Sequence, residues 1–240
     1  MWSICKKELH QFFSNLTGYI AIILFLLVSG LFLFVLKDSN LFDFGYASLD
    51  KFFELAPWIL IFLVPAITMR SLSEEFKTGT FEILQTKPLS KWQIIAGKYF
   101  SVLLVLAVVV VSTFIYIVTI NKLSATGSID SGSITGSYIG LFLLAAVFAA
   151  IGICCSSYTS NAVVAFLLSG FTCLILYSGF NAVSKLPVFQ GNVDYYLEML
   201  GIDFHYRSMS RGVLDTRDLV YFISIIYLFL LIAVKNLHKK

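Results

Sequence analysis

Charged residues are scarce in this chain. Asp, Glu, Lys and Arg together make up 13% of its 240 residues, whereas soluble domains carry about 25%. Hydrophobic residues make up 58%. This composition excludes an ordinary soluble domain and predicts an integral membrane protein.

The scarcity is concentrated in six stretches without any Asp, Glu, Lys or Arg. A membrane-spanning helix needs about 20 mostly apolar residues, and these stretches meet or approach that length. Their near-continuous apolar character excludes the alternating pattern of a membrane β-barrel. We therefore predict one all-α domain over residues 1–240, a polytopic membrane protein with six transmembrane helices, of which the second is the shortest. The predicted spans are residues 17–36, 55–69, 99–121, 135–159, 162–184 and 219–234.

Histidine and carboxylate groups are also missing from these spans, since His10, His205 and His238 all lie outside them. Ion-coupled transporters and intramembrane hydrolases need such groups inside the membrane. A phosphate-binding loop is missing too, because Gly97-Lys98 is followed by Tyr99 rather than Ser or Thr. We predict no catalytic residues and no bound cofactor in this chain, so its energy source must be a partner.

The cysteines predict neither a disulfide nor a metal site. Cys154 and Cys155 are adjacent, which disfavours a bridge between them, and Cys173 lies in another apolar span. The packing of small apolar residues explains them better. Ser169-Gly170 and Ser178-Gly179 are likewise interpreted as small residues that allow close helix packing.

The N-terminal residues 1–16 predict a short helix in the membrane interface. Its apolar positions recur at helical spacing opposite a polar face. For the apolar stretch that follows, residues 17–36, a cleavable signal sequence is the alternative to an anchored first helix, although the stretch is long for a signal core. The apolar positions are Trp2, Cys5, Leu9 and Phe12, and the polar ones Lys6, Lys7 and Gln11. The Lys and Arg residues at the span ends favour a cytoplasmic location for both termini.

The longest polar interruption in the first half of the chain is residues 70–98. Ser73-Glu74-Glu75 is typical of a helix start, Gly79 of an interruption, and Lys87-Pro88 of a turn. Residues 90–93 have the capping-box form that begins a new helix. We predict a compact helix-turn-helix elbow at the cytoplasmic face. Spacing alone leaves an ordinary solvated loop as the alternative.

This segment resembles the signature of permease subunits of type-II ATP-binding-cassette (ABC) exporters. The matching residues are Glu75, Gly79, Thr80, Glu82, Ile83, Leu84, Pro88, Leu89, Ser90, Gly97 and Lys98. The resemblance implies a coupling helix that seats on a cytoplasmic ABC ATPase subunit, and ATP and Mg bound by that subunit. The residues it assigns to ATPase coupling are Glu74, Glu75, Phe76, Gly79, Thr80, Glu82, Leu84 and Pro88.

Residues 50–58, 64–70, 136–142 and 208–218 resemble the gliding-motility-associated ABC permease subunits, GldF, of Bacteroidota. That resemblance implies a multi-pass subunit of the bacterial inner membrane. Its expected partners are a separate ATPase, a second membrane subunit, like or unlike, and the lipid bilayer, with no nucleic acid.

The longest outer segment, residues 185–218, predicts a short amphipathic helix. Val193, Tyr196, Leu197 and Leu200 share one face at helical spacing. His205, Arg207 and Arg211 are candidate contacts for an anionic substrate, a lipid head group or a partner. Solvated charges are the alternative.

The leading functional hypothesis is export, or mechanical work, driven by a partner ATPase. A non-transporting subunit that transmits force to a periplasmic partner or assembly machinery is one alternative. A polytopic membrane enzyme, with His205 as its sole candidate group, is another. Ser29, Thr68, Thr172 and Ser178 are the polar candidates for a pathway, although such hydroxyls usually bond within membrane helices.

Overall fold

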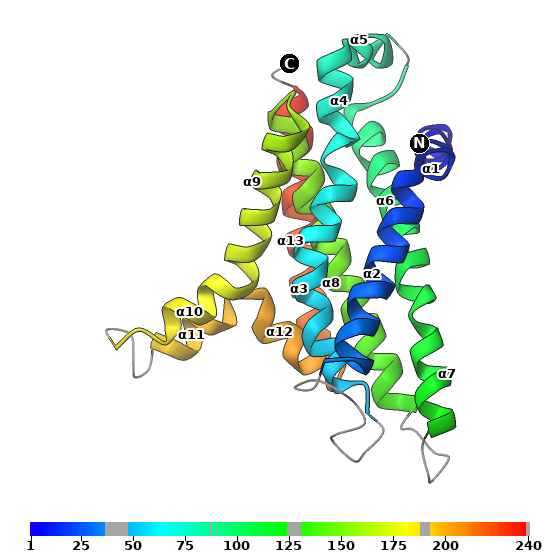
Figure 1. The fold of residues 1–240 in the computed structure, drawn as a ribbon. Coiled ribbons are helices and arrows are strands. Elements are labelled where there is room, and N and C mark those ends of the chain that lie inside the picture. Colours follow the sequence, from blue (N-terminus) through cyan, green and yellow to red (C-terminus); the bar gives the residue numbers. More distant parts are fainter. Residues whose placement is uncertain (37–47, 87, 124–130, 188–192, 239–240) are drawn as a thin grey trace.

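The computed structural model describes residues 1–36, 48–86, 88–123, 131–187 and 193–238 (Figure 1). Every regular element in these ranges is a helix. In chain order they are α1 (Trp2–Ser14), α2 (Leu16–Phe34), α3 (Asp50–Thr68), α4 (Arg70–Thr78), α5 (Thr80–Gln85), α6 (Lys91–Ser112), α7 (Phe114–Leu123), α8 (Ser131–Tyr158), α9 (Ala162–Leu174), a π-helical turn (Ile175–Gly179), α10 (Phe180–Ser184), α11 (Val193–Met199), α12 (Ile202–Met209) and α13 (Thr216–Leu237).

Five helical stretches are long and apolar enough to cross a membrane. They are Asp50–Thr78, Lys91–Lys122, Gly132–Tyr158, Ala162–Ser184 and Thr216–Leu237. The bent pair α1 and α2, with 65° between its two parts, is a sixth candidate. This confirms an all-α polytopic membrane protein. The predicted limits of the second span are wrong, because that helix begins at Asp50 and continues into α4.

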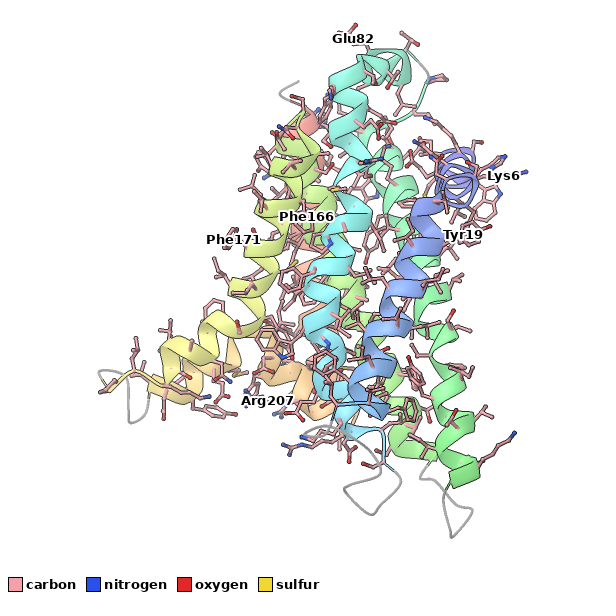
Figure 2. The ribbon with its side chains drawn as sticks, viewed as in Figure 1. Lys6, Tyr19, Glu82, Phe166, Phe171 and Arg207 are labelled. Atoms are coloured by element: carbon pink, nitrogen blue, oxygen red, sulfur yellow. The ribbon has the colours of Figure 1, made fainter. Side chains whose placement is uncertain are left out.

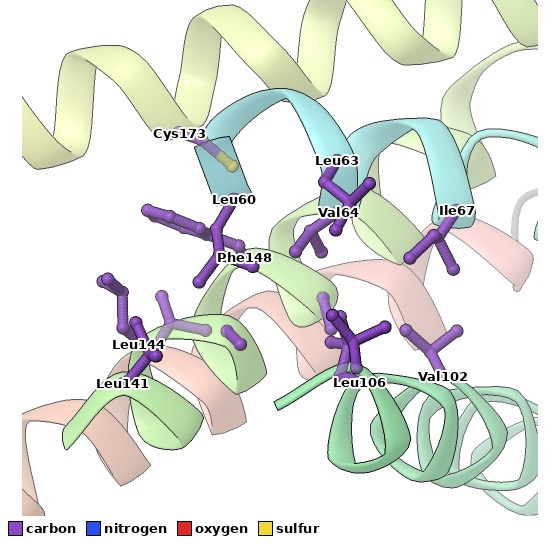
Figure 3. Packing of buried hydrophobic residues seen from close by; sticks show 14 of the residues in the cluster. Leu60, Leu63, Val64, Ile67, Val102, Leu106, Leu141, Leu144, Phe148 and Cys173 are labelled. Atoms are coloured by element: carbon purple, nitrogen blue, oxygen red, sulfur yellow. The ribbon is translucent and has the colours of Figure 1, made fainter. Parts of the chain in front are cut away.

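Helix α8 lies at the centre of the bundle and packs against α3, α6, α9, α12 and α13. Figure 3 shows Phe148 of α8 next to Leu60 of α3, with Leu144 of α8 and Leu106 of α6 in the same cluster. All four are fully buried. Cys154 and Cys173 are buried in the same core, in agreement with a packing role. Side-chain packing of this density leaves little freedom for α3 and α8 to shift against each other.

Both termini lie at one end of the bundle, together with α4 and α5 (Figure 1). We refer to this as the α4–α5 end. Helix α12 lies near the opposite end, and α10 and α11 extend sideways from the bundle. The shared end agrees with the prediction that both termini and the coupling segment face the same side. The cytoplasmic location of that side stays a prediction.

Helices α3 and α8 lie close together at Gly152. A Cβ atom at this position would lie 2.0 Å from Thr68 Oγ1 and 2.8 Å from Thr68 Cβ. Gly170 of α9 is different, because an added Cβ meets no atom within 4 Å in the described part of the chain. Close packing therefore explains Gly152 but not Gly170.

We expect Gly152→Ala to destabilise the purified chain by about 1–3 kcal/mol, because overpacking forces the two helices apart. The matched variant Gly170→Ala should leave stability unchanged or raise it by up to about 1 kcal/mol, since Ala is the better helix former. Thermal unfolding in detergent measures both. Equal unfolding temperatures for the two variants would contradict the close contact at Gly152.

Candidate functional site

The coupling segment folds as a continuation of α3. Only Met69 separates α3 from α4, so the predicted helix start at Ser73 is wrong and the helix begins at Arg70. Helix α8 stabilises this α3–α4 joint. Ser156 Oγ of α8 accepts hydrogen bonds from the N–H groups of Leu72 and Ser73 at 3.0 and 3.1 Å. Ser156 also donates to the Met69 carbonyl at 3.2 Å. A hydroxyl from the central helix thus replaces backbone partners that the break removes.

The turn between α4 and α5 depends on Gly79. Its φ of +70° is a left-handed conformation that favours glycine. Phe76 and Phe81, one on each side of the turn, pack edge to face with ring centroids 4.9 Å apart, and Phe81 is buried. The predicted interruption at Gly79 is therefore confirmed, and the two short helices share a small apolar core. We call residues 70–85 the α4–α5 elbow.

The chain returns to the membrane through the capping box predicted at residues 90–93. Ser90 Oγ accepts from the Gln93 N–H, and the Gln93 side chain accepts from the Ser90 N–H, each at 3.2 Å. Lys91 Nζ donates to the Leu237 carbonyl at 2.6 Å. A cation at the C-terminus of α13 is electrostatically favourable, so the start of α6 and the end of α13 are tied together.

A buried ion cluster holds the elbow against the bundle. Lys98, on α6, is 1% exposed, and its Nζ lies 2.8 Å from Glu8 Oε1 and 2.9 Å from Glu75 Oε1. The same ammonium donates to the Ser71 carbonyl at 2.6 Å. The ammonium group thus donates hydrogen bonds to Glu8 and Ser71 and forms an ion pair with Glu75. The cluster joins α1, α4 and α6 at one point.

Gly97 makes this cluster possible. A Cβ at Gly97 would lie 3.0 Å from the Met1 carbonyl oxygen and 3.1 Å from Ile4 Cβ, so α1 lies directly on α6 here. The Gly97-Lys98 pair thus combines a close helix contact with the cation inside it. On α1 the buried face is Ile4, Cys5 and Glu8, while Trp2, predicted on the apolar face, is 71% exposed.

The eight predicted coupling residues divide into two groups. Glu75, Phe76 and Leu84 are partly buried and attach the elbow to the bundle. Five others are exposed, and Figure 2 shows Glu82 at the extreme tip of the molecule. The exposed five are Glu74, Gly79, Thr80, Glu82 and Pro88. Among the eight predicted residues, these five are the ones that a partner can contact without disturbing the fold.

At the opposite end His205 is buried rather than at the surface, with 5% exposure. Its Nδ1 lies 2.7 Å from Asp218 Oδ1, and its Nε2 lies 3.0 Å from the Met199 carbonyl oxygen. The ring stacks on Tyr221 with centroids 3.9 Å apart. His205 therefore joins α11, α12 and α13, and it does not offer a catalytic group at the membrane surface.

The other outer candidates do not converge on His205. Arg207 is half exposed and pairs with Glu198 and Asp203, whose carboxylates also accept from Asn181. The Arg211 side chain is exposed. Helix α11 confirms the helix predicted around residue 196, although the structure buries none of its residues.

Helix α12 is also fixed to α3. The buried Tyr206 hydroxyl donates to the Phe53 carbonyl at 2.8 Å. Burial raises the pKa of Tyr206 well above its usual value, so the hydroxyl keeps its proton and its hydrogen bond. The outer segment is thus attached to α3 as well as to α13.

The four hydroxyl groups considered for a pathway all bond within their own helices. Each donates to the carbonyl four residues earlier, which satisfies it in a membrane helix. The pairs are Ser29 with Phe25, Thr68 with Val64, Thr172 with Leu168 and Ser178 with Leu174. No group of three or more His, Cys, Asp or Glu side chains suited to a metal occurs among the described residues.

Residues 2–234 match the sequence profile of the family described as "ABC-2 family transporter protein". The match covers nearly the whole chain, from the start of α1 to residue 234 within α13. No curated protein of known function matched this chain.

We expect Lys98→Met to destabilise the chain by about 3–5 kcal/mol, because it leaves two buried carboxylates without their cation. Lys7 lies 3.7 Å from Glu75, but its side chain is 62% exposed, so Lys7→Met should cost at most about 1 kcal/mol. Adding Glu8→Gln and Glu75→Gln to Lys98→Met should recover part of the loss in thermal unfolding. A triple variant less stable than Lys98→Met would contradict this account.

His205→Phe should destabilise the chain by about 3 kcal/mol, since Asp218 and the Met199 carbonyl then lose a buried partner. Arg207→Ala, at a half-exposed position, should cost less than about 1 kcal/mol. A double-mutant cycle of His205→Phe with Asp218→Leu measures the coupling. Additive losses would show that the two side chains do not stabilise each other.

Proposed function

Since this chain belongs to the ABC-2 family of transporter proteins and is a membrane permease subunit rather than an ATPase, we propose that its α4–α5 elbow docks the ATPase subunit. The observation that carries the proposal is the division of the elbow into an exposed tip and a buried attachment. ATP and Mg would be bound by the partner. The exposed carboxylates Glu74 and Glu82 would face the ATPase.

The attachments of the elbow support a direct mechanical connection. Helix α4 extends α3, Ser156 of α8 closes the joint, and Lys98 of α6 binds Glu75. A displacement of the elbow therefore acts on three long helices at once. Packed interiors transmit such displacements because they have little room to absorb them. Closure of a docked ATPase would in this way reorient the bundle.

A groove on the lipid-facing side supports pairing with a second membrane subunit. It measures about 630 Å³ and is lined by apolar side chains of α2 and α3 together with Phe166 of α9. Trp58 and Phe62 in this groove are 47% and 60% exposed. On the adjacent face of α9, Gly170 has open space around it. We propose that a second subunit packs on this face and that a translocation path lies between the two.

We further propose membership of the gliding-motility subfamily in a bacterial inner membrane, on the sequence resemblance of four separate segments. Export remains the leading role. The sideways extension of α10 and α11 in Figure 1 favours force transmission as the second candidate. Helix α11 carries Tyr195 and Tyr196, which are 55% and 67% exposed. Either role needs the same ATPase contact.

We expect Glu74→Lys combined with Glu82→Lys to reduce co-purified ATPase subunit by about tenfold or more, because reversed charges oppose a complementary surface. The control is Glu54→Lys, whose side chain is 71% exposed near the opposite end of α3. The wild type, the double variant and Glu54→Lys should unfold at similar temperatures, since Glu74 and Glu82 do not belong to the Lys98 cluster. Undiminished ATPase binding by the double variant, or an equal loss with Glu54→Lys, would refute docking at the elbow.

A further inference from the structure

A second groove lies beside the α4–α5 elbow, between α1, α2, α3 and α4. Its volume is about 490 Å³. Helix α1 is bent by 65° from α2, and Figure 1 shows it nearly end-on beside the top of α2. The groove therefore lies where a transmembrane helix meets an interfacial one, at the depth of lipid head groups.

The two halves of this groove differ in chemistry. One half is apolar and is formed by α2 and α3, with Ala21, Leu24 and Leu63 among its residues. The other half is polar and is formed by α1 and α4, with the cations Lys7 and Arg70 and the carboxylates Glu8, Glu74 and Glu75. Because this half carries charges of both signs, a ligand that fits both halves is an amphiphile whose head group has an anionic and a cationic group.

Two buried polar atoms in the lining have no hydrogen-bond partner among the described residues, namely Ser71 Oγ and Glu75 Oε2. Ser71 is 9% exposed, and the Glu75 side chain is 13% exposed. Unpartnered buried groups of this kind cost about 1–3 kcal/mol or more. The carboxylate oxygen can only accept a hydrogen bond, so it calls for a donor, and a cationic N–H donor satisfies it best.

We propose that this groove binds a phospholipid with a primary ammonium head group, that is, a phosphatidylethanolamine. Its ammonium would donate to Glu75, its phosphodiester would lie near Lys7 and Arg70, and its acyl chains would follow the apolar half. Phosphatidylcholine lacks an N–H donor and phosphatidylglycerol offers only neutral hydroxyl donors, so neither gives the carboxylate a charged hydrogen-bond donor. Leu24, Leu63 and Ala66 line both this groove and the apolar groove beside Trp58 and Phe62. The shared residues give the acyl chains a continuous path into the membrane core.

The test uses the purified full chain without any ATPase, so its outcome is separate from that of the docking proposal. The chain is incubated with equal amounts of phosphatidylethanolamine, phosphatidylcholine and phosphatidylglycerol, and retained lipid is counted by native mass spectrometry. We expect about tenfold preference for phosphatidylethanolamine, the effect of one hydrogen bond to a charged group. Equal retention of the three lipids, or a preference for either of the other two, overturns the proposal.

Variants locate the site. Arg70→Gln and Ser71→Ala should each lower retained phosphatidylethanolamine several-fold, while the matched control Arg211→Gln, exposed at the opposite end, should not. Ser71→Ala removes a buried hydroxyl without a partner, so it should leave the unfolding temperature of the lipid-free chain unchanged or raise it. Retention that is the same in Arg70→Gln and Arg211→Gln places the lipid elsewhere and also overturns the proposal.

Discussion

The buried ammonium of Lys98 fixes the α4–α5 end of this protein. An ion removed from water costs several kcal/mol unless its partners are well placed, and here the partners come from α1 and α4. The cluster can form only when the N-terminal helix, the elbow and α6 are all in position. The cluster therefore fixes the position of the α4–α5 elbow against the bundle. The exposed tip of the elbow is free for a partner because none of its residues is needed to satisfy the cation.

The rest of the bundle extends this constraint toward the opposite end. Ser156 ties the α3–α4 joint to α8, and Gly152 lets α8 approach Thr68 one turn away. At the far end of α3 the Phe53 carbonyl accepts from Tyr206 of α12, whose neighbour His205 binds Asp218 of α13. Helix α3 is thus attached to the elbow at one end and to the outer helices at the other. A protein that is driven from one side of a membrane requires a mechanical connection of this kind to the other side.

Much of the fold follows from local sequence signals, whereas the ion cluster does not. Apolar runs locate the spans, and Gly79 and the Ser90 capping box locate turns, because each acts within a few residues. Lys98 directly precedes the span predicted at residues 99–121 and so resembles a flanking charge, yet it shares a helix face with Ile94, Ile95 and Val102, all buried. A lysine on the apolar stripe of a membrane helix is the signal that could have revealed it. The start of α4 at Arg70 was missed since it depends on Ser156, more than 80 residues away. The His205 pair likewise forms between two helices.

The exposed apolar face of α2, α3 and α9 raises a different physical question. In a membrane, apolar surface gains nothing by leaving lipid for a protein neighbour, because lipid chains are as apolar as leucine. The second subunit that we propose for this face would therefore be selected by shape, through close van der Waals contact and small residues. The groove beside Trp58 and Phe62 and the open space around Gly170 give this face a shape that a partner can fit. Specific pairing on this face then depends on how well a partner fills the groove rather than on its hydrophobicity, and even a modest change in side-chain volume there would alter which subunit fits.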